Sequence, residues 1–441
     1  MADQGGSQHG IARTSRVRSE EQKQRDLQRI QKYRELEDQV RSHVSRADYS
    51  PQLFQLTSKL LRLNPEYYTL WNVRRRCLIS GLFSRPSAGS SCSTACSSTF
   101  PTATTTQSST SCSSSSSATT PPAPGSPTAG RSGTTAEPGA AGAPSGTFAS
   151  DDPAQAPAAD STDSATAAAA AAAAEQQDLA TIQSELSFTI PLLLESPKCY
   201  WIWSYRQWIL AQAIARLRPH VARQVWEAEL GLASKMLGKD RRNFHAWGYR
   251  RHVVTQLESA ALRGASMVEA EFEYTYRMIQ TDLSNFSAWH SRSKLIPRLL
   301  DERGADDAAR RAFLDKELNQ IREALNVGPE DQSLWYYHQF LMLNLVDPDK
   351  HPAMTRGIAA GDRAAYLARE IDEIKELLED YPDVKLIYEA LFEYTLYLCQ
   401  LEDRQPTADE RADLAAWLAK LKELDPMRNG RWADLERECG L

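Results

Sequence analysis

The chain has 441 residues and a formal net charge of −6 at pH 7, with 51 lysines and arginines against 57 acidic residues. This balance disfavours a general nucleic-acid-binding protein, whose surface is normally basic. No apolar run approaches the roughly 18 residues that a membrane-spanning helix needs, and the N-terminus MADQGGSQHG lacks the apolar core of a secretory signal. Seven cysteines, an odd number without a CxxC pair, favour reduced thiols in a cytoplasmic protein that has no metal site of its own.

The N-terminal part of the chain divides into a tail and a first helical region. Residues 1–19 are rich in Gly, Ser and Arg, and we expect a flexible tail. Residues 20–83 are rich in helix-forming side chains, and leucines recur at helical spacing between about Pro51 and Leu63. Asn64 and Pro65 then predict a turn, followed by a helix that carries Trp71 and Arg74.

A segment of different composition follows. Residues 84–174 consist of Ser, Thr, Ala, Pro and Gly with almost no large apolar side chains, and they end in eight consecutive alanines. Such a segment cannot bury enough apolar surface to offset the entropy of ordering the chain. We therefore expect a disordered insert in a loop between two repeats, with the alanines compatible with the start of the next helix.

A motif built on Trp-x-x-Arg occurs five times, once before the insert and four times after it. Its last three tryptophan spacings are 44, 42 and 46 residues, and the first spacing falls to about 40 once the insert is removed. A constant period in the low forties is typical of stacked helical hairpins. With two weaker units near residues 371–398 and 414–439, residues 175–441 hold repeats 2 to 7. The expected fold is all-α: a right-handed superhelical α-α solenoid of about seven helical hairpins. The repeated tryptophans are Trp71, Trp203, Trp247, Trp289 and Trp335.

The spacing within each repeat predicts a structural role for most of the motif. The tryptophan and the residue three positions later lie on one helix face, so we expect the ring to fill the layer between hairpins, with the aromatic three positions earlier below it. The arginines are expected to bond to carbonyls or acids of the neighbouring unit, and Asp240 and Asp282 to cap the second helices. The arginines are Arg74, Arg206, Arg250 and Arg292, and the preceding aromatics are Tyr68, Tyr200, Phe244 and Phe286.

One copy differs in its turn. Only the second repeat, SPKCYWIWSYRQ, places a lysine there, Lys198, two residues before the aromatic Tyr200. A lysine beside a helix start can contact an anion. On spacing alone an ordinary exposed loop lysine is the commoner explanation.

The repeats resemble those of protein prenyltransferase α subunits. DRRNFHAWGYRR, DLSNFSAWHSRS and GPEDQSLWYYHQ are closest to the α subunit of Rab geranylgeranyltransferase, the type II enzyme, and HGIARTSRVRSEEQ is similar to its N-terminus. The resemblance covers about residues 9–83 and 179–345. It implies a heterodimer in which an α–α barrel β subunit holds the zinc and the lipid pocket. It also implies transfer of geranylgeranyl from geranylgeranyl diphosphate to C-terminal cysteines of Rab GTPases that an escort protein presents.

The same resemblance implies roles for three residues. Lys198 would be the catalytic residue of this chain: it would reach the isoprenoid diphosphate across the subunit interface and stabilise the charge that develops on it, and the neighbouring aromatic Tyr200 would bind the same diphosphate. His9 would be a regulatory ligand of the β-subunit zinc, although an unstructured histidine fits as well. Cys199 and Gln332 depart from the family pattern. The alternatives are the α subunit shared by farnesyltransferase and geranylgeranyltransferase I, and a non-enzymatic helical-repeat adaptor.

Overall fold

The computed structural model describes residues 19–84, 161–347, 350, 354 and 357–441. His9, most of the expected N-terminal tail and residues 85–160 of the expected insert lie outside the described residues. All regular structure in the described part is helical, and none of its helices is long and apolar enough to cross a membrane. The helices are α1 (Glu20–Ser45), α2 (Pro51–Leu63), α3 (Tyr68–Cys77), α4 (Ser161–Glu195), α5 (Tyr200–Arg216), α6 (Pro219–Lys239), α7 (Phe244–Leu257), α8 (Val268–Thr281), α9 (Phe286–Glu302), α10 (Asp307–Val327), α11 (Gln332–Val346), α12 (Ala360–Asp380), α13 (Lys385–Leu401), α14 (Ala408–Leu424) and α15 (Asn429–Cys439).

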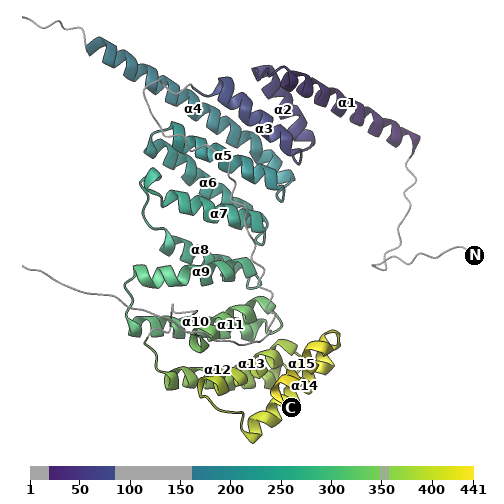
Figure 1. The fold of residues 1–441 in the computed structure, drawn as a ribbon, viewed down its shortest axis with the longest axis vertical. Helices are drawn as coiled ribbons and strands as arrows, with labels where there is room; N and C mark the ends of the chain where they lie inside the picture. Colours follow the sequence, from purple (N-terminus) through teal and green to yellow (C-terminus); the bar gives the residue numbers. More distant parts are fainter. Residues whose placement is uncertain (1–18, 85–160, 348–349, 351–353, 355–356) are drawn as a thin grey trace, which may run out of the picture. The chain divides into compact units, whose positions relative to one another are not determined.

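The helices form hairpins that follow one another in chain order (Figure 1). From α2 onward each even-numbered helix pairs with the next odd-numbered one, which makes seven hairpins in the described part of the chain, with α1 packed against α2. We number the hairpins one to seven, and call the contact between two neighbours a junction. The expectation of an all-α solenoid of about seven hairpins is confirmed.

Helix boundaries follow from residue chemistry, with one correction. Asp240 and Asp282 end the first helices of their hairpins and do not cap the second ones. The N-caps are Asn243 and Asn285, whose side-chain oxygens accept from backbone N–H groups of α7 and α9. The capping position immediately precedes the helix, four residues before the tryptophan, and the aspartates lie too far upstream to reach it.

The helix after the insert begins earlier than the sequence boundary at Glu175. Its first residue is Ser161, so the run of alanines lies inside α4. Alanine has the highest intrinsic helix propensity and loses no side-chain entropy on ordering, so this run readily extends a helix.

Each motif tryptophan ties its helix to its own turn. All five rings are at most 5% exposed. Each indole Nε1–H donates to the backbone carbonyl six residues earlier, over 2.6 to 2.9 Å. The ring therefore fills the core while its one polar atom is satisfied, which is how a buried tryptophan avoids a desolvation cost.

Each motif arginine joins one hairpin to the next. Arg74, Arg206, Arg250 and Arg292 bind, in that order, glutamates on the first helix of the following hairpin, each through two hydrogen bonds of 2.6 to 2.8 Å. At three junctions a tyrosine two residues after the following tryptophan donates its hydroxyl to the same carboxylate. The glutamates are Glu185, Glu229, Glu271 and Glu317, and the tyrosines are Tyr205, Tyr249 and Tyr337.

Candidate functional site

The turn between α4 and α5 holds Lys198 on a fixed backbone. The carbonyl of Pro197 accepts two hydrogen bonds, from the indole of Trp203 at 2.9 Å and from the amide of Asn243 in the next hairpin at 3.0 Å. A carbonyl with two donors from two hairpins is held at both lone pairs. The backbone that carries Lys198 is therefore positioned by buried groups, while the lysine side chain itself extends into solvent.

Lys198 has one acidic neighbour. Its Nζ lies 3.6 Å from Oδ2 of Asp240, and the lysine side chain is 71% exposed. An exposed pair of this kind contributes at most about 1 kcal/mol. The ammonium group is thus available to a more highly charged anion, and Asp240 keeps it near the turn.

Three aromatic side chains lie beside the turn that carries Lys198, residues 196–199, which we call the lysine turn. Tyr200, 55% exposed, packs edge-on against Trp201 with ring centroids 5.3 Å apart and lies 6.4 Å from the ring of His245. Burial lowers the pKa of His245, and the Lys198 charge lowers it further, against the opposing effect of Glu66. At neutral pH the imidazole is therefore uncharged, and it can accept or donate one hydrogen bond beside Tyr200.

Cys199 occupies the position that asparagine holds in the next hairpin. Its Sγ lies 3.5 Å from the carbonyl of Pro65 in the first hairpin, just as the amide of Asn243 donates to Pro197 in the second. Burial raises the pKa of the Cys199 thiol to about 11. The sulfur stays protonated at neutral pH and can act as the donor, so this departure from the family pattern preserves the tie between neighbouring turns.

The aromatics at the start of the second helices are exposed, which corrects the expectation that they lie beneath the tryptophans. Phe244 is 68% exposed, and the equivalent rings are about half exposed. Each is the first residue of its helix, where no preceding turn covers it, so only the tryptophan three residues later reaches the core. We call these four rings the aromatic row; its members are Tyr68, Tyr200, Phe244 and Phe286.

Reasoning from sequence missed two residues beside the turn, Trp201 and His245. Both directly follow a member of the aromatic row, Tyr200 and Phe244. The repeat itself was the signal, because a side chain one position after an exposed ring lies near the same exposed helix end.

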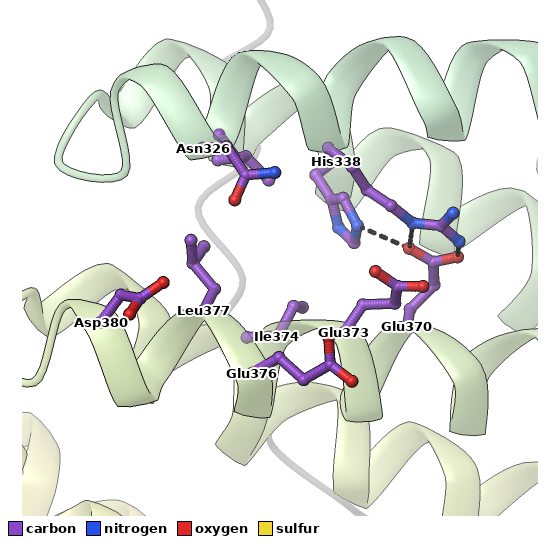
Figure 2. A pocket seen from close by; sticks show the side chains of 10 residues that line it. Asn326, His338, Glu370, Glu373, Ile374, Glu376, Leu377 and Asp380 are labelled. Atoms are coloured by element: carbon purple, nitrogen blue, oxygen red, sulfur yellow. Dashed lines mark hydrogen bonds and ion pairs between the residues drawn. The ribbon is translucent and has the colours of Figure 1, made fainter.

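A separate cavity of about 160 Å³ lies between α10, α11 and α12, three hairpins beyond the lysine turn. Figure 2 shows His338 and Glu370 at one end and Asn326 and Asp380 at the other. His338 takes the place of the motif arginine here. Its Nε2 lies 3.2 Å from Glu370, and its Nδ1 lies 3.0 Å from the hydroxyl of Tyr394. The cavity therefore belongs to the junction between the fifth and sixth hairpins and does not adjoin Lys198.

Comparison with known proteins identifies the repeat. The model of the protein prenyltransferase alpha subunit repeat matches residues 51–80, 182–213, 226–257, 268–299 and 314–345. These ranges coincide with the first five hairpins, from the first helix or part of it through the motif helix.

Several curated relatives are described as geranylgeranyl transferase type-2 subunit alpha. The Schizosaccharomyces pombe protein is 32% identical over 48% of this chain and 62% of its own length. The Saccharomyces cerevisiae protein is 30% identical over 57% of this chain and 72% of its own, and the Candida albicans protein is 25% identical over 97% of both.

A solved structure shares the fold. The structure described as Candida albicans protein geranylgeranyltransferase-I complexed with GGPP matches with a TM-score of 0.51 at 16% identity, over 92% of this chain and 89% of that one. At that identity the match shows only that the two chains share a fold. The five repeats and the type-2 relatives together place this chain in the protein prenyltransferase alpha subunits, as a member of the geranylgeranyl transferase type-2 alpha subunit family.

Proposed function

We propose that this chain pairs with a prenyltransferase β subunit in the cytoplasm to form a Rab geranylgeranyltransferase. The heterodimer would transfer geranylgeranyl from geranylgeranyl diphosphate to C-terminal cysteines of Rab GTPases that an escort protein presents. The observation that carries the proposal is the lysine turn: an exposed ammonium group on a backbone held from two hairpins, next to the exposed ring of Tyr200.

Lys198 would act on the leaving group. In the transfer, the deprotonated cysteine sulfur (the thiolate) forms a bond to C1 of the geranylgeranyl chain as the bond from C1 to the diphosphate oxygen breaks, and the electron pair of that bond leaves with the diphosphate. Negative charge therefore grows on the diphosphate in the transition state. A fixed cation at that point lowers the barrier because it interacts more strongly with the transition state than with the ground state. The Lys198 ammonium would leave Asp240 and bind the diphosphate instead, because the diphosphate carries more negative charge than one carboxylate.

Tyr200 and His9 would have lesser roles. Tyr200 would place its hydroxyl beside the same diphosphate. His9 would be a regulatory ligand of the zinc on the β subunit. The described residues of this chain bring together no group of three or more His, Cys, Asp or Glu side chains that could hold a metal ion. The zinc would lie on the β subunit, as the family resemblance implies, and the role of Lys198 does not depend on it.

The aromatic row supports the heterodimer. Rings that recur at the same helix end of four successive hairpins leave a repeated apolar surface in water, and such surfaces mark protein interfaces. Because the lysine turn directly precedes one of these rings, a partner that covers the row also meets Lys198. The partner that fits is the β subunit, whose active site would complete the diphosphate site.

Co-expression with the β subunit of a type-2 enzyme tests the proposal. The expected result is a stable complex that geranylgeranylates a Rab–escort complex and leaves a CaaX peptide unmodified. Transfer to the CaaX peptide without the escort would instead favour the farnesyltransferase and geranylgeranyltransferase I α subunit. Failure to bind any prenyltransferase β subunit would favour a helical-repeat adaptor.

A further inference from the structure

We propose that the chain has a hinge at the junction between the third and fourth hairpins, about which two blocks move: the described helices α1 to α7 on one side and α8 to α15 on the other. The proposal does not depend on the enzymatic activity. It rests on three contacts that recur at the neighbouring junctions and are absent from this one among the described residues.

The first missing contact is a close approach of helices. At the junctions on either side, second helices pack directly on each other, α5 on α7 and α9 on α11. Between α6 or α7 and α8 or α9, no two helices pack as closely as these two pairs do. Interdigitated helix packing supplies most of the stiffness of a repeat array, because each unit contacts only its neighbours.

The second missing contact is the tyrosine hydroxyl. Tyr205, Tyr249 and Tyr337 each donate to the glutamate that the preceding arginine binds. The equivalent position in the fourth hairpin is Ser291, which is too short to reach Glu271. Its Oγ is buried and has no hydrogen-bond partner among the described residues.

The third missing contact is a hydrogen bond between neighbouring turns; at this junction Arg242 lies 3.8 Å from Asp282 of the next turn, in a partly exposed ion pair. Asn243 donates its side-chain amide to the turn of the second hairpin at 3.0 Å. In the fifth hairpin Ser333 donates to the carbonyl of Ser284 at 3.3 Å. Asn285 occupies the place of Asn243 at this junction, and its buried Nδ2 has no partner among the described residues.

The contacts that remain suit a pivot. Arg250 and Glu271 stay bonded at 2.6 and 2.8 Å, and Trp247 meets the edge of Tyr274 at 5.9 Å. Arg298 reaches back to Glu258 at 2.8 Å from an exposed side chain. One buried ion pair and a few exposed surface pairs can hold the two blocks together while the angle between them changes.

The connection between the blocks also differs from a tight turn. It runs through the short 3-10 turn Ala260–Leu262 and continues through Arg263, whose φ of 51° is in the left-handed region. Gly264 follows, and a Cβ there would lie 2.0 Å from the carbonyl oxygen of Leu257. This segment is longer than the hairpin turns and gives the blocks room to rotate.

Distance measurements between spin labels test the hinge in the full chain. Labels attached through non-natural amino acids avoid the native cysteines. A pair at Lys235 and Ala270 spans the third junction, and a pair at Ala270 and Lys316 spans the fourth; all three side chains are exposed. We expect a broader distance distribution across the third junction than across the fourth. Equal widths would overturn the proposal.

Two substitutions sharpen the test. Ser291→Tyr supplies the missing hydroxyl to Glu271 and should narrow the distribution across the third junction. Tyr249→Ser removes the tyrosine hydroxyl that binds Glu229 at the second junction. It should broaden the distance distribution between labels at Ser184 and Lys235. The second variant keeps the test decisive if Ser291→Tyr fails to fold. An unchanged width in Tyr249→Ser would contradict the assignment of stiffness to the tyrosine contact.

Discussion

Arg206 in the second hairpin binds Glu229 in the third through two hydrogen bonds of 2.7 Å, Nε to Oε1 and Nη2 to Oε2. Both side chains are at most 3% exposed. The hydroxyl of Tyr249 donates to the same carboxylate at 2.6 Å. The carboxylate is thus satisfied by groups from two hairpins, which makes the stability of one hairpin depend on the presence of the next.

Arg206→Ala should lower the free energy of unfolding by about 3 to 5 kcal/mol, because it leaves the Glu229 carboxylate buried without its counter-charge. Chemical denaturation measures this loss. Arg277→Ala is the matched control: its exposed pair with Glu273 is one helical turn apart, and its loss should change stability by no more than about 0.5 kcal/mol. Equal losses in the two variants would contradict the role assigned to the buried pair.

Glu370 should make the stability of the chain depend on acid pH. Burial alone raises its pKa, but hydrogen bonds from His338 and Arg322 outweigh burial and lower it to about 2. A folded-state pKa below the unfolded value means that the unfolded chain binds the proton more readily. The stabilisation is therefore fully present above about pH 4.5 and is lost as the pH falls towards 2. Chemical denaturation at several pH values across this range should show the loss. In Glu370→Gln the unfolding free energy should change less steeply with pH.

Removal of one ring from the aromatic row should weaken assembly and leave folding intact. Phe244→Ala removes a side chain that is 68% exposed in the free chain, so the unfolding free energy should change little. A ring that becomes buried against the β subunit is worth on the order of 1–2 kcal/mol, or about a tenfold weaker Kd. Titration of the labelled β subunit with each variant measures this change in Kd. Val327→Ala, another exposed apolar residue outside the row, is the control, and equal affinities in both variants would argue against the row as an interface.

The repeat period predicted the fold because it comes from local rules. A tryptophan every forty-odd residues, with turn residues before it, determines the hairpin length whatever the partners are. The same reasoning failed at Phe244, because spacing gives the helix face and does not reveal that the helix begins at that residue. It failed at Asp240 for the related reason that the end of one helix and the cap of the next are only three residues apart.

The partners of the arginines could not be predicted individually. Glu185 lies 111 residues from Arg74, on the far side of the insert, and many glutamates lie at similar helical spacing. The tyrosine two residues after the tryptophan was visible in three copies, yet its meaning depends on a carboxylate that only the folded chain places beside it. The exposed Lys198 was recognisable because a single copy departs from the others in its turn, and its role remains a proposal.

The most direct measurement of the central claim is the turnover of Lys198→Ala in the assembled enzyme. The substitution removes an exposed side chain, so the complex with the β subunit should form with unchanged affinity. Multiple-turnover transfer of geranylgeranyl to a Rab–escort complex should then slow by roughly a hundredfold, the effect typical of losing one group that stabilises transition-state charge. Lys239→Ala, an exposed lysine at the end of the next first helix, should keep the wild-type rate. A wild-type kcat in Lys198→Ala would contradict the role of this chain in the active site.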